Sequence, residues 1–167
     1  MKKRVEVNDA QAIYTLGNYY RDGRNGFPQD YNKALELWHR AGELGHAKSY
    51  QTIGDAYDNG EGVKVEEKKA EHYYELAAMM GNVEARYNLG FQEGKAGNMD
   101  RAIKHFMIAV GSGCSDSLGM IQKMHRNRKA TKDDYTAALQ LYQIYLGEIK
   151  SPQRDEAAAA LENYRYY

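Results

Sequence analysis

The sequence predicts an all-α fold of stacked antiparallel helix pairs, and two recurring patterns support this prediction. The first is Ala-x-Ala-x-x-x-Leu-Gly-x-x-Tyr, which recurs with a period of about 36 residues and has a worn fourth copy. The second follows each copy and reads basic-Ala, an aromatic residue, Ala and then Gly. Self-similarity at this period is the signature of a helical repeat array. The repeated glycine, alanine and aromatic positions are Gly17, Ala34 and Trp38, then Gly54, Ala70 and Tyr74, then Gly90, Ala102 and Phe106.

The composition of the 167-residue chain fits tightly spaced helices. Leu, Ile, Val and Phe are scarce enough to raise disorder as a possibility. The formal net charge is zero, however, and disordered chains usually combine low hydrophobicity with net charge. Alanine is abundant and favours helices, while 15 tyrosines supply the missing apolar bulk. We therefore expect an ordered helical domain.

The first repeat shows how each helix pair is predicted. Ile13, Leu16 and Tyr20 share one helical face, and Gly17 lies in the middle of that face. A glycine inside a helix costs roughly 1 kcal/mol relative to alanine. Its recurrence therefore predicts a close contact between helices that offsets this cost. The second helix of the pair is anchored by Ala34, Leu37, Trp38 and Ala41.

Capping residues mark the ends of the predicted helices. Asp30 and Asn98 suit N-cap positions, and Thr131-x-x-Asp134 forms a capping box. The glycines at 45, 81 and 113 suit the left-handed position that follows a helix. Ser151 and Pro152 suit the N-cap and first residue of a last helix. The predicted single domain, residues 1–167, thus comprises repeats at about 9–45, 46–81, 82–113 and a degenerate 114–149, with a capping helix at about 151–165.

The repeated residues resemble the Sel-one-like repeat (SLR) family, a relative of the tetratricopeptide repeat. The family pattern joins Tyr-x-Leu-Gly-x-x-Tyr, a Gly-x-Gly-Val turn, Asp-x-x-Lys-Ala, an aromatic residue and Ala-Ala-x-x-Gly-His/Asn-Ala. Residues 60–63 (Gly-Glu-Gly-Val) and 45–47 (Gly-His-Ala) match it, and the resemblance spans roughly residues 8–148. It implies a right-handed α-superhelix that acts as an adaptor or scaffold. A cysteine-rich branch with one disulfide per repeat is excluded, because Cys114 is the only cysteine.

Related repeats bind partners in a concave groove lined by the first helix of each pair, so the non-core positions of those helices are candidate contacts. Phe91 stands out because Asn18 and Asp55 occupy the equivalent positions. Phe91 either anchors a partner or packs against the neighbouring helix. For Tyr14 and Tyr87 the family pattern favours packing. The full candidate set is Tyr14, Asn18, Arg21, Gln51, Asp55, Asp58, Tyr87, Phe91, Lys95, Lys123 and Arg126.

The candidate groove changes charge along the array. Asp55 and Asp58 are acidic, whereas Lys95, Lys123 and Arg126 are basic. We expect a protein or peptide partner with a matching charge order, because complementary charges steer encounter and register.

Other partner classes and compartments receive less support. Equal numbers of basic and acidic residues argue against a dedicated nucleic-acid binder. The basic run at 123–132 has no interleaved aromatic residues for base stacking and suits a solvated helix end. The polar residues after Lys2, Lys3 and Arg4 do not continue as a signal peptide, and no apolar run suits membrane insertion. We expect an intracellular, cytoplasmic protein.

The sequence offers no catalytic constellation. The histidines are scattered and form no His-Glu-x-x-His motif, so neither a metal nor another cofactor is expected. Cys114 has serine neighbours and suits an ordinary thiol rather than a nucleophile. We expect a non-enzymatic interaction module. The alternative is the adaptor or substrate-binding portion of a larger enzyme, such as a RING-type ubiquitin ligase. The oligomeric state stays open, since the N-terminal repeat could pair with another copy.

Overall fold

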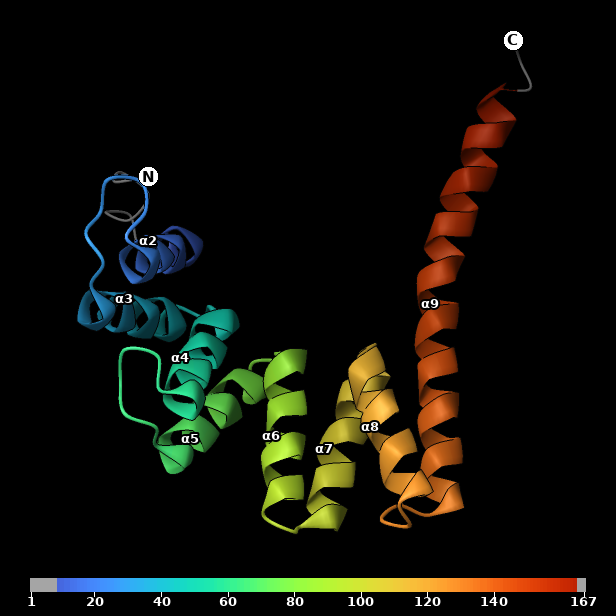
Figure 1. Cartoon of the computed structure of the whole chain (residues 1–167). Helices are drawn as coiled ribbons and strands as arrows, with labels where there is room; N and C mark the ends of the chain where they lie inside the picture. Colours follow the sequence, from blue (N-terminus) through green and yellow to red (C-terminus); the bar gives the residue numbers. More distant parts are fainter. Residues whose placement is uncertain (1–8, 165–167) are drawn as a thin grey trace. The chain divides into compact units, whose positions relative to one another are not determined.

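The computed structural model describes the backbone of residues 9–164 and the side chains of residues 9–148. Within that range it contains eight helices and no strand. Figure 1 shows longer loops between α2 and α3 and between α4 and α5, and short turns between the other helices. The all-α class and the antiparallel helix pairs are confirmed, while the right-handed superhelix stays a prediction. In chain order the helices are α2 (Ala10–Asp22), α3 (Tyr31–Glu43), α4 (Ala47–Asn59), α5 (Glu67–Met79), α6 (Val83–Lys95), α7 (Met99–Gly111), α8 (Ser115–Arg126) and α9 (Lys132–Tyr164).

The chain divides into two compact units, with the boundary between Gln92 and Glu93 inside α6. In the first unit, α2 packs on α3, α3 on α4, and α4 on α5. In the second unit, α7, α8 and α9 pack on one another. Each predicted repeat before residue 114 contains two of these helices, and α8 with the start of α9 occupies the fourth.

Two mid-helix glycines of the first unit, Gly17 and Gly54, allow an aromatic side chain to lie against the helix backbone. A Cβ on Gly17 would lie 2.6 Å from the Trp38 indole. A Cβ on Gly54 would lie 2.6 Å from the Tyr74 ring. Real Cβ atoms essentially never approach another heavy atom this closely. The aromatic contact therefore requires glycine, which explains why both helices keep a residue with poor helix propensity.

The aromatic residues and alanines of the repeat pattern lie in the core. Ala34, Ala70 and Ala102 are fully buried, and Trp38, Tyr74 and Phe106 are at most 2% exposed. Ile53 of α4 packs with Ala34 and Trp38 of α3. The apolar core of the first unit therefore continues from one helix pair into the next, as an array of repeats requires.

Three helix ends share one hydrogen-bonding pattern. Gly45, Gly81 and Gly113 have φ values of 94°, 83° and 90°, which confirms the predicted left-handed positions. The backbone N–H of His46 donates to the carbonyl of Ala41 at 3.0 Å, and the equivalent bonds follow α5 and α7. These bonds satisfy carbonyl groups that the end of a helix would otherwise leave unpaired.

The predicted N-caps fare differently. Asp30 accepts from the Lys33 N–H at 2.9 Å, and Thr131 and Asp134 exchange the two bonds of a capping box. Asn98 occupies the N-cap of α7, but its side chain makes no capping bond there. Its amide instead donates to Glu93 Oε2 at 2.7 Å. This alternative bond explains the difference, because one amide group cannot point in both directions.

The prediction that a separate helix begins at Ser151 is wrong, because α9 continues through Ser151 and Pro152 to Tyr164. A proline inside a helix removes one backbone hydrogen bond and is unfavourable. Residues Ala157–Ala160 follow the proline, and alanine has the highest helix propensity of any residue type. The helix therefore continues as the helix propensity of the neighbouring residues favours, although Ser151 and Pro152 locally suggest a new helix start.

Candidate functional site

The polar residues that follow Gly17 and Gly54 each bond to a buried aromatic side chain. Trp38 Nε1 donates to Asn18 Oδ1 at 3.1 Å. The Tyr74 hydroxyl donates to Asp55 Oδ1 at 2.8 Å. A buried donor needs an acceptor, so part of the polarity at these positions serves the fold itself. Phe106, the aromatic residue of the third repeat, has no such donor, which removes the need for an acceptor at the position of Phe91.

Asp55 is the centre of a polar network between α4, α5 and α6. Besides the Tyr74 bond, it accepts from Asn88 Nδ2 at 3.2 Å and from Gln51 Nε2. Burial raises the pKa of Asp55, although the hydrogen bond from Tyr74 acts in the opposite direction. Burial, followed by the nearby Asp55 charge, raises the pKa of Tyr74 above its ordinary value. Asp55 is thus a partly buried carboxylate that joins three helices.

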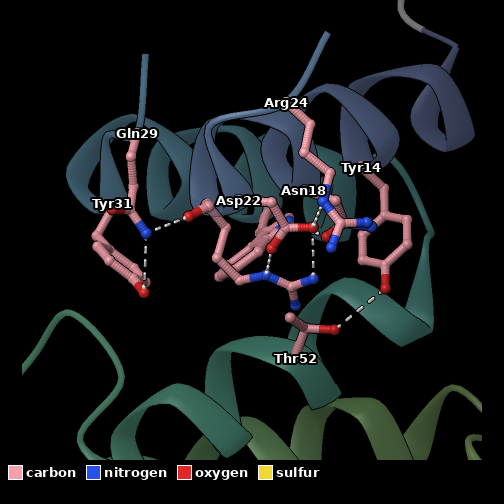
Figure 2. Close-up of polar contacts among 9 residues, drawn as sticks. Tyr14, Asn18, Asp22, Arg24, Gln29, Tyr31 and Thr52 are labelled. Carbon is pink, nitrogen blue, oxygen red and sulfur yellow. Dashed lines mark hydrogen bonds and ion pairs between the residues drawn. The ribbon is translucent and has the colours of Figure 1, made fainter. Parts of the chain in front are cut away.

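Two candidate residues at the position three before the glycine are engaged in packing. Figure 2 shows Tyr14 directed toward Thr52, whose side-chain oxygen lies 3.4 Å from the Tyr14 hydroxyl. The Tyr14 ring also lies against His46, with 4.6 Å between ring centroids. Gln51, the equivalent residue of α4, is only 5% exposed. Tyr87 in α6 is half-buried. This position therefore offers a partner little open surface in the first unit.

Arg21 is held by neighbours within its own repeat. Its Nε donates to Asp22 Oδ1 at 2.7 Å, and its guanidinium lies over the Trp38 indole, 5.9 Å from the ring centroid. The hydrogen bond with Asp22 raises the pKa of Arg21 and lowers that of Asp22. Arg24 reaches the same carboxylate at 3.5 Å, as Figure 2 shows. Arg21 thus has an internal partner on both sides of its guanidinium.

The more open candidates lie farther along the chain. Asp58 is half-buried and accepts from Gln92 Nε2 of α6 at 3.3 Å. Phe91 has 40% of its surface exposed. In the second unit, Lys95, Lys123 and Arg126 are all exposed. The candidates on α2, α4 and α6 of the first unit thus lie on helices that contact one another through side chains.

One buried charge was absent from the sequence-based candidates. Glu93 is 6% exposed, and its carboxylate accepts from Arg101 at 2.7 Å and from Asn98 at 2.7 Å. These bonds close the short turn between α6 and α7. The shortened spacing near Asn98 was the available signal, because a short turn must be stabilised locally.

The described side chains contain no group of three or more His, Cys, Asp or Glu residues placed to hold a metal ion. Nor does any helix in the described part of the chain have the length and apolar character that a bilayer span requires.

Comparisons with known proteins agree with this architecture. The family model described as the Sel1 repeat matches residues 10–46, 53–82 and 83–109, more than half of the chain. A Sel1 repeat protein from Oxalobacter formigenes has a similar solved structure, with a TM-score of 0.73 and 26% identity, covering 86% of this chain and 60% of the other.

Two curated relatives are similar in sequence over part of this chain. Chitin synthase regulatory factor 3 of Schizosaccharomyces pombe is 33% identical over 79 residues, which are 47% of this chain and 8% of that protein. The ERAD-associated E3 ubiquitin-protein ligase component HRD3A of Arabidopsis thaliana is 33% identical over 93 residues, which are 52% and 14%. The chain therefore matches only a small part of either relative's length. Together with its three matched repeats, these similarities show that the chain belongs to the Sel1 repeat family.

Proposed function

We propose that this chain is a non-catalytic scaffold that binds a segment of a partner protein on the face formed by the first helices of its repeats. We call this surface the A face, and in the first unit it consists of the outward positions of α2, α4 and α6. The observation that carries the proposal is that the two sides of these helices differ in their contacts. One side packs glycine against a buried aromatic residue, while Asp58 and Phe91 remain accessible.

The relatives support the same class of function. Their names describe a regulatory factor and a component of a ligase. Helical repeat proteins expose extended surfaces for binding, because each repeat contacts only its neighbours. Phe91 supplies an apolar anchor and Asp58 a charge, a combination that suits a protein interface.

The test is affinity capture from the source cell with a matched pair of double variants. Asp58→Lys/Phe91→Ala alters the A face. Glu75→Lys/Met79→Ala makes the same kinds of change on α5, where both side chains are exposed. We expect partners that bind to the wild type and the α5 variant but not to the A-face variant. Equal recovery by both variants, each still helical by circular dichroism, would refute binding at the A face.

A second candidate function is the adaptor part of a larger ubiquitin ligase. It rests on the similarity to HRD3A, which is itself described as a ligase component. The discriminating observation is the complete gene: a Cys/His zinc pattern encoded beside these repeats supports the ligase, and its absence supports the independent scaffold.

A further inference from the structure

A cluster of basic side chains surrounds the turn between α8 and α9 in the second unit. No Asp or Glu occurs between Asp116 and Asp133, although the whole chain has equal numbers of acidic and basic residues. Every basic side chain of the cluster is exposed. We call this cluster the basic turn, and it consists of Lys123, Arg126, Arg128, Lys129 and Lys132.

The basic turn has no acidic partner among the described side chains, because none of its members forms an ion pair there. Exposed cations elsewhere do pair, as Lys33 does with Glu36 at 2.6 Å. Asp133 and Asp134 begin α9, and the carboxylate of Asp134 already accepts two hydrogen bonds from Thr131. The basic turn therefore carries more positive charge than its described neighbours neutralise.

Arg128 occupies a backbone position at which the other helix ends have glycine. Its φ is 58°, in the left-handed region. In that region the Cβ of a residue other than glycine comes too close to the backbone, so arginine is unfavourable for the fold. The helices from α2 to α7 are each followed by a left-handed glycine, namely Gly23, Gly45, Gly60, Gly81, Gly97 and Gly113. An unfavourable residue at such a position indicates a role beyond folding, which a simple solvated helix end does not explain.

Hydrogen bonds hold the backbone of the turn in place. The Lys129 N–H donates to the carbonyl of Met124 at 2.8 Å, and the Arg128 N–H donates to that of His125 at 3.0 Å. The ring of His125 donates from Nδ1 to the carbonyl of Ala130 at 3.2 Å. Because the backbone is already ordered, a ligand has to order only the basic side chains when it binds.

We propose that the basic turn binds an acidic segment, rich in Asp and Glu, of a protein partner. Lysine and arginine bind carboxylates through charge-assisted hydrogen bonds, and arginine can form two parallel bonds to one carboxylate. The basic turn lies in the second unit, so this surface adds to the scaffold and stands without the A face.

The side chains around the turn favour a protein segment over other anionic partners. Single-stranded nucleic acids use aromatic rings to stack their bases, but Tyr135 is already stacked on His125, with 5.6 Å between ring centroids. A membrane surface calls for apolar side chains that enter the lipid, and no large apolar side chain between Gly111 and Gln143 is exposed. Carboxylates of a peptide need only the exposed cations.

The test is fluorescence anisotropy of the whole chain with a fluorescein-labelled peptide of alternating Glu and Ser. A peptide with Gln in place of Glu is the neutral control. Arg128→Gly removes one positive charge from the basic turn, and Lys64→Gly removes one from the exposed loop before α5. We expect saturable binding of the acidic peptide alone. Arg128→Gly should weaken this binding about threefold, the effect of one exposed ion pair, whereas Lys64→Gly should leave it unchanged.

Urea unfolding of the same variants, followed by circular dichroism, separates binding from folding. Glycine relieves the left-handed position, so Arg128→Gly should raise the urea midpoint while it weakens binding. Wild-type affinity in Arg128→Gly, an equal loss in Lys64→Gly or a lower midpoint in Arg128→Gly overturns the proposal. Equal binding of the Gln peptide overturns it as well, as does tighter binding of a labelled oligothymidine or of phosphatidylserine vesicles.

These outcomes are separate from the fate of the A face. If affinity capture depends on the A face while the acidic peptide fails to bind, only the assignment of the basic turn is wrong. If the acidic peptide binds and Arg128→Gly weakens it, but no partner depends on the A face, only the A-face assignment is wrong.

Discussion

Gly54→Ala tests the packing on which the repeats depend. A Cβ at residue 54 would lie 2.6 Å from two ring carbons of Tyr74 and 3.3 Å from the carbonyl oxygen of Ala70. Because Tyr74 is 1% exposed, its ring has little room to move away. Any movement also weakens the bond from the Tyr74 hydroxyl to Asp55.

The magnitude follows from three contributions. Overpacking of this kind costs about 1–3 kcal/mol, and loss of a hydrogen bond to a carboxylate costs about 1.5–3 kcal/mol. Replacing glycine by alanine inside a helix contributes about 1 kcal/mol in the opposite direction. We therefore expect Gly54→Ala to lower the free energy of unfolding by about 2–3 kcal/mol, since the ring movement only partly breaks the bond.

The assay is urea unfolding followed by circular dichroism, with Gly119→Ala as the matched control. Gly119 lies inside α8, and a Cβ there would meet no atom within 4 Å. Gly119→Ala should therefore raise stability by about 1 kcal/mol. In a Tyr74→Leu background, Gly54→Ala should lose most of its effect. A Gly54→Ala protein as stable as the wild type would refute the packing argument.

Four further predictions concern hydrogen bonds and titration. Burial raises the pKa of Asp55 in the folded state above its ordinary value of 3.8, so the folded protein binds this proton more tightly than the unfolded chain does. The stability of the wild type relative to Asp55→Asn should therefore fall as the pH rises from 3.8 through the folded pKa. The hydrogen bond from Thr131 lowers the folded pKa of Asp134, so the stability of the wild type relative to Asp134→Asn should fall as the pH drops below 3.8. The same pH trend for Asp55→Asn and Asp134→Asn would contradict both assignments. A double-mutant cycle of Trp38→Phe with Asn18→Leu should give a coupling of about 0.5–1.5 kcal/mol in urea unfolding, and additivity would argue against their bond. Thr131→Ala should cost about 1 kcal/mol by removing the cap of α9, and an unchanged urea midpoint would contradict this role.

The helix pairs could be predicted because their signals are local and repeat along the chain. The recurrence of a glycine inside the first helix of each pair indicated a close contact between helices, and the structure shows this contact as Gly17 against Trp38 and Gly54 against Tyr74. The glycine that ends a helix needs only its own backbone angle to be recognised, as Gly45 illustrates.

The burial and hydrogen bonding of the candidate contact residues could not be predicted in this way, because they depend on which side chains face one another across helices. The sequence position of Gln51 suggested a groove residue, yet α4 and its neighbours bury it. Asp55 suggested an exposed charge, yet it accepts from Tyr74 and Asn88 on two other helices. The sequence did hold a signal that these positions serve internal hydrogen bonds. An indole N–H requires an acceptor, so Trp38 could have been paired with Asn18 across the first repeat.

The most direct measurement for the central claim is site-specific photocrosslinking. A benzophenone amino acid replaces Phe91 on the A face or Met79 on α5, which is 82% exposed and serves as the control. After irradiation in the source cell, mass spectrometry identifies the crosslinked peptides. The scaffold assignment predicts one partner segment that crosslinks from position 91 and not from position 79. Partner crosslinks from position 79 alone would contradict it and place the interface on the opposite helices of the repeats.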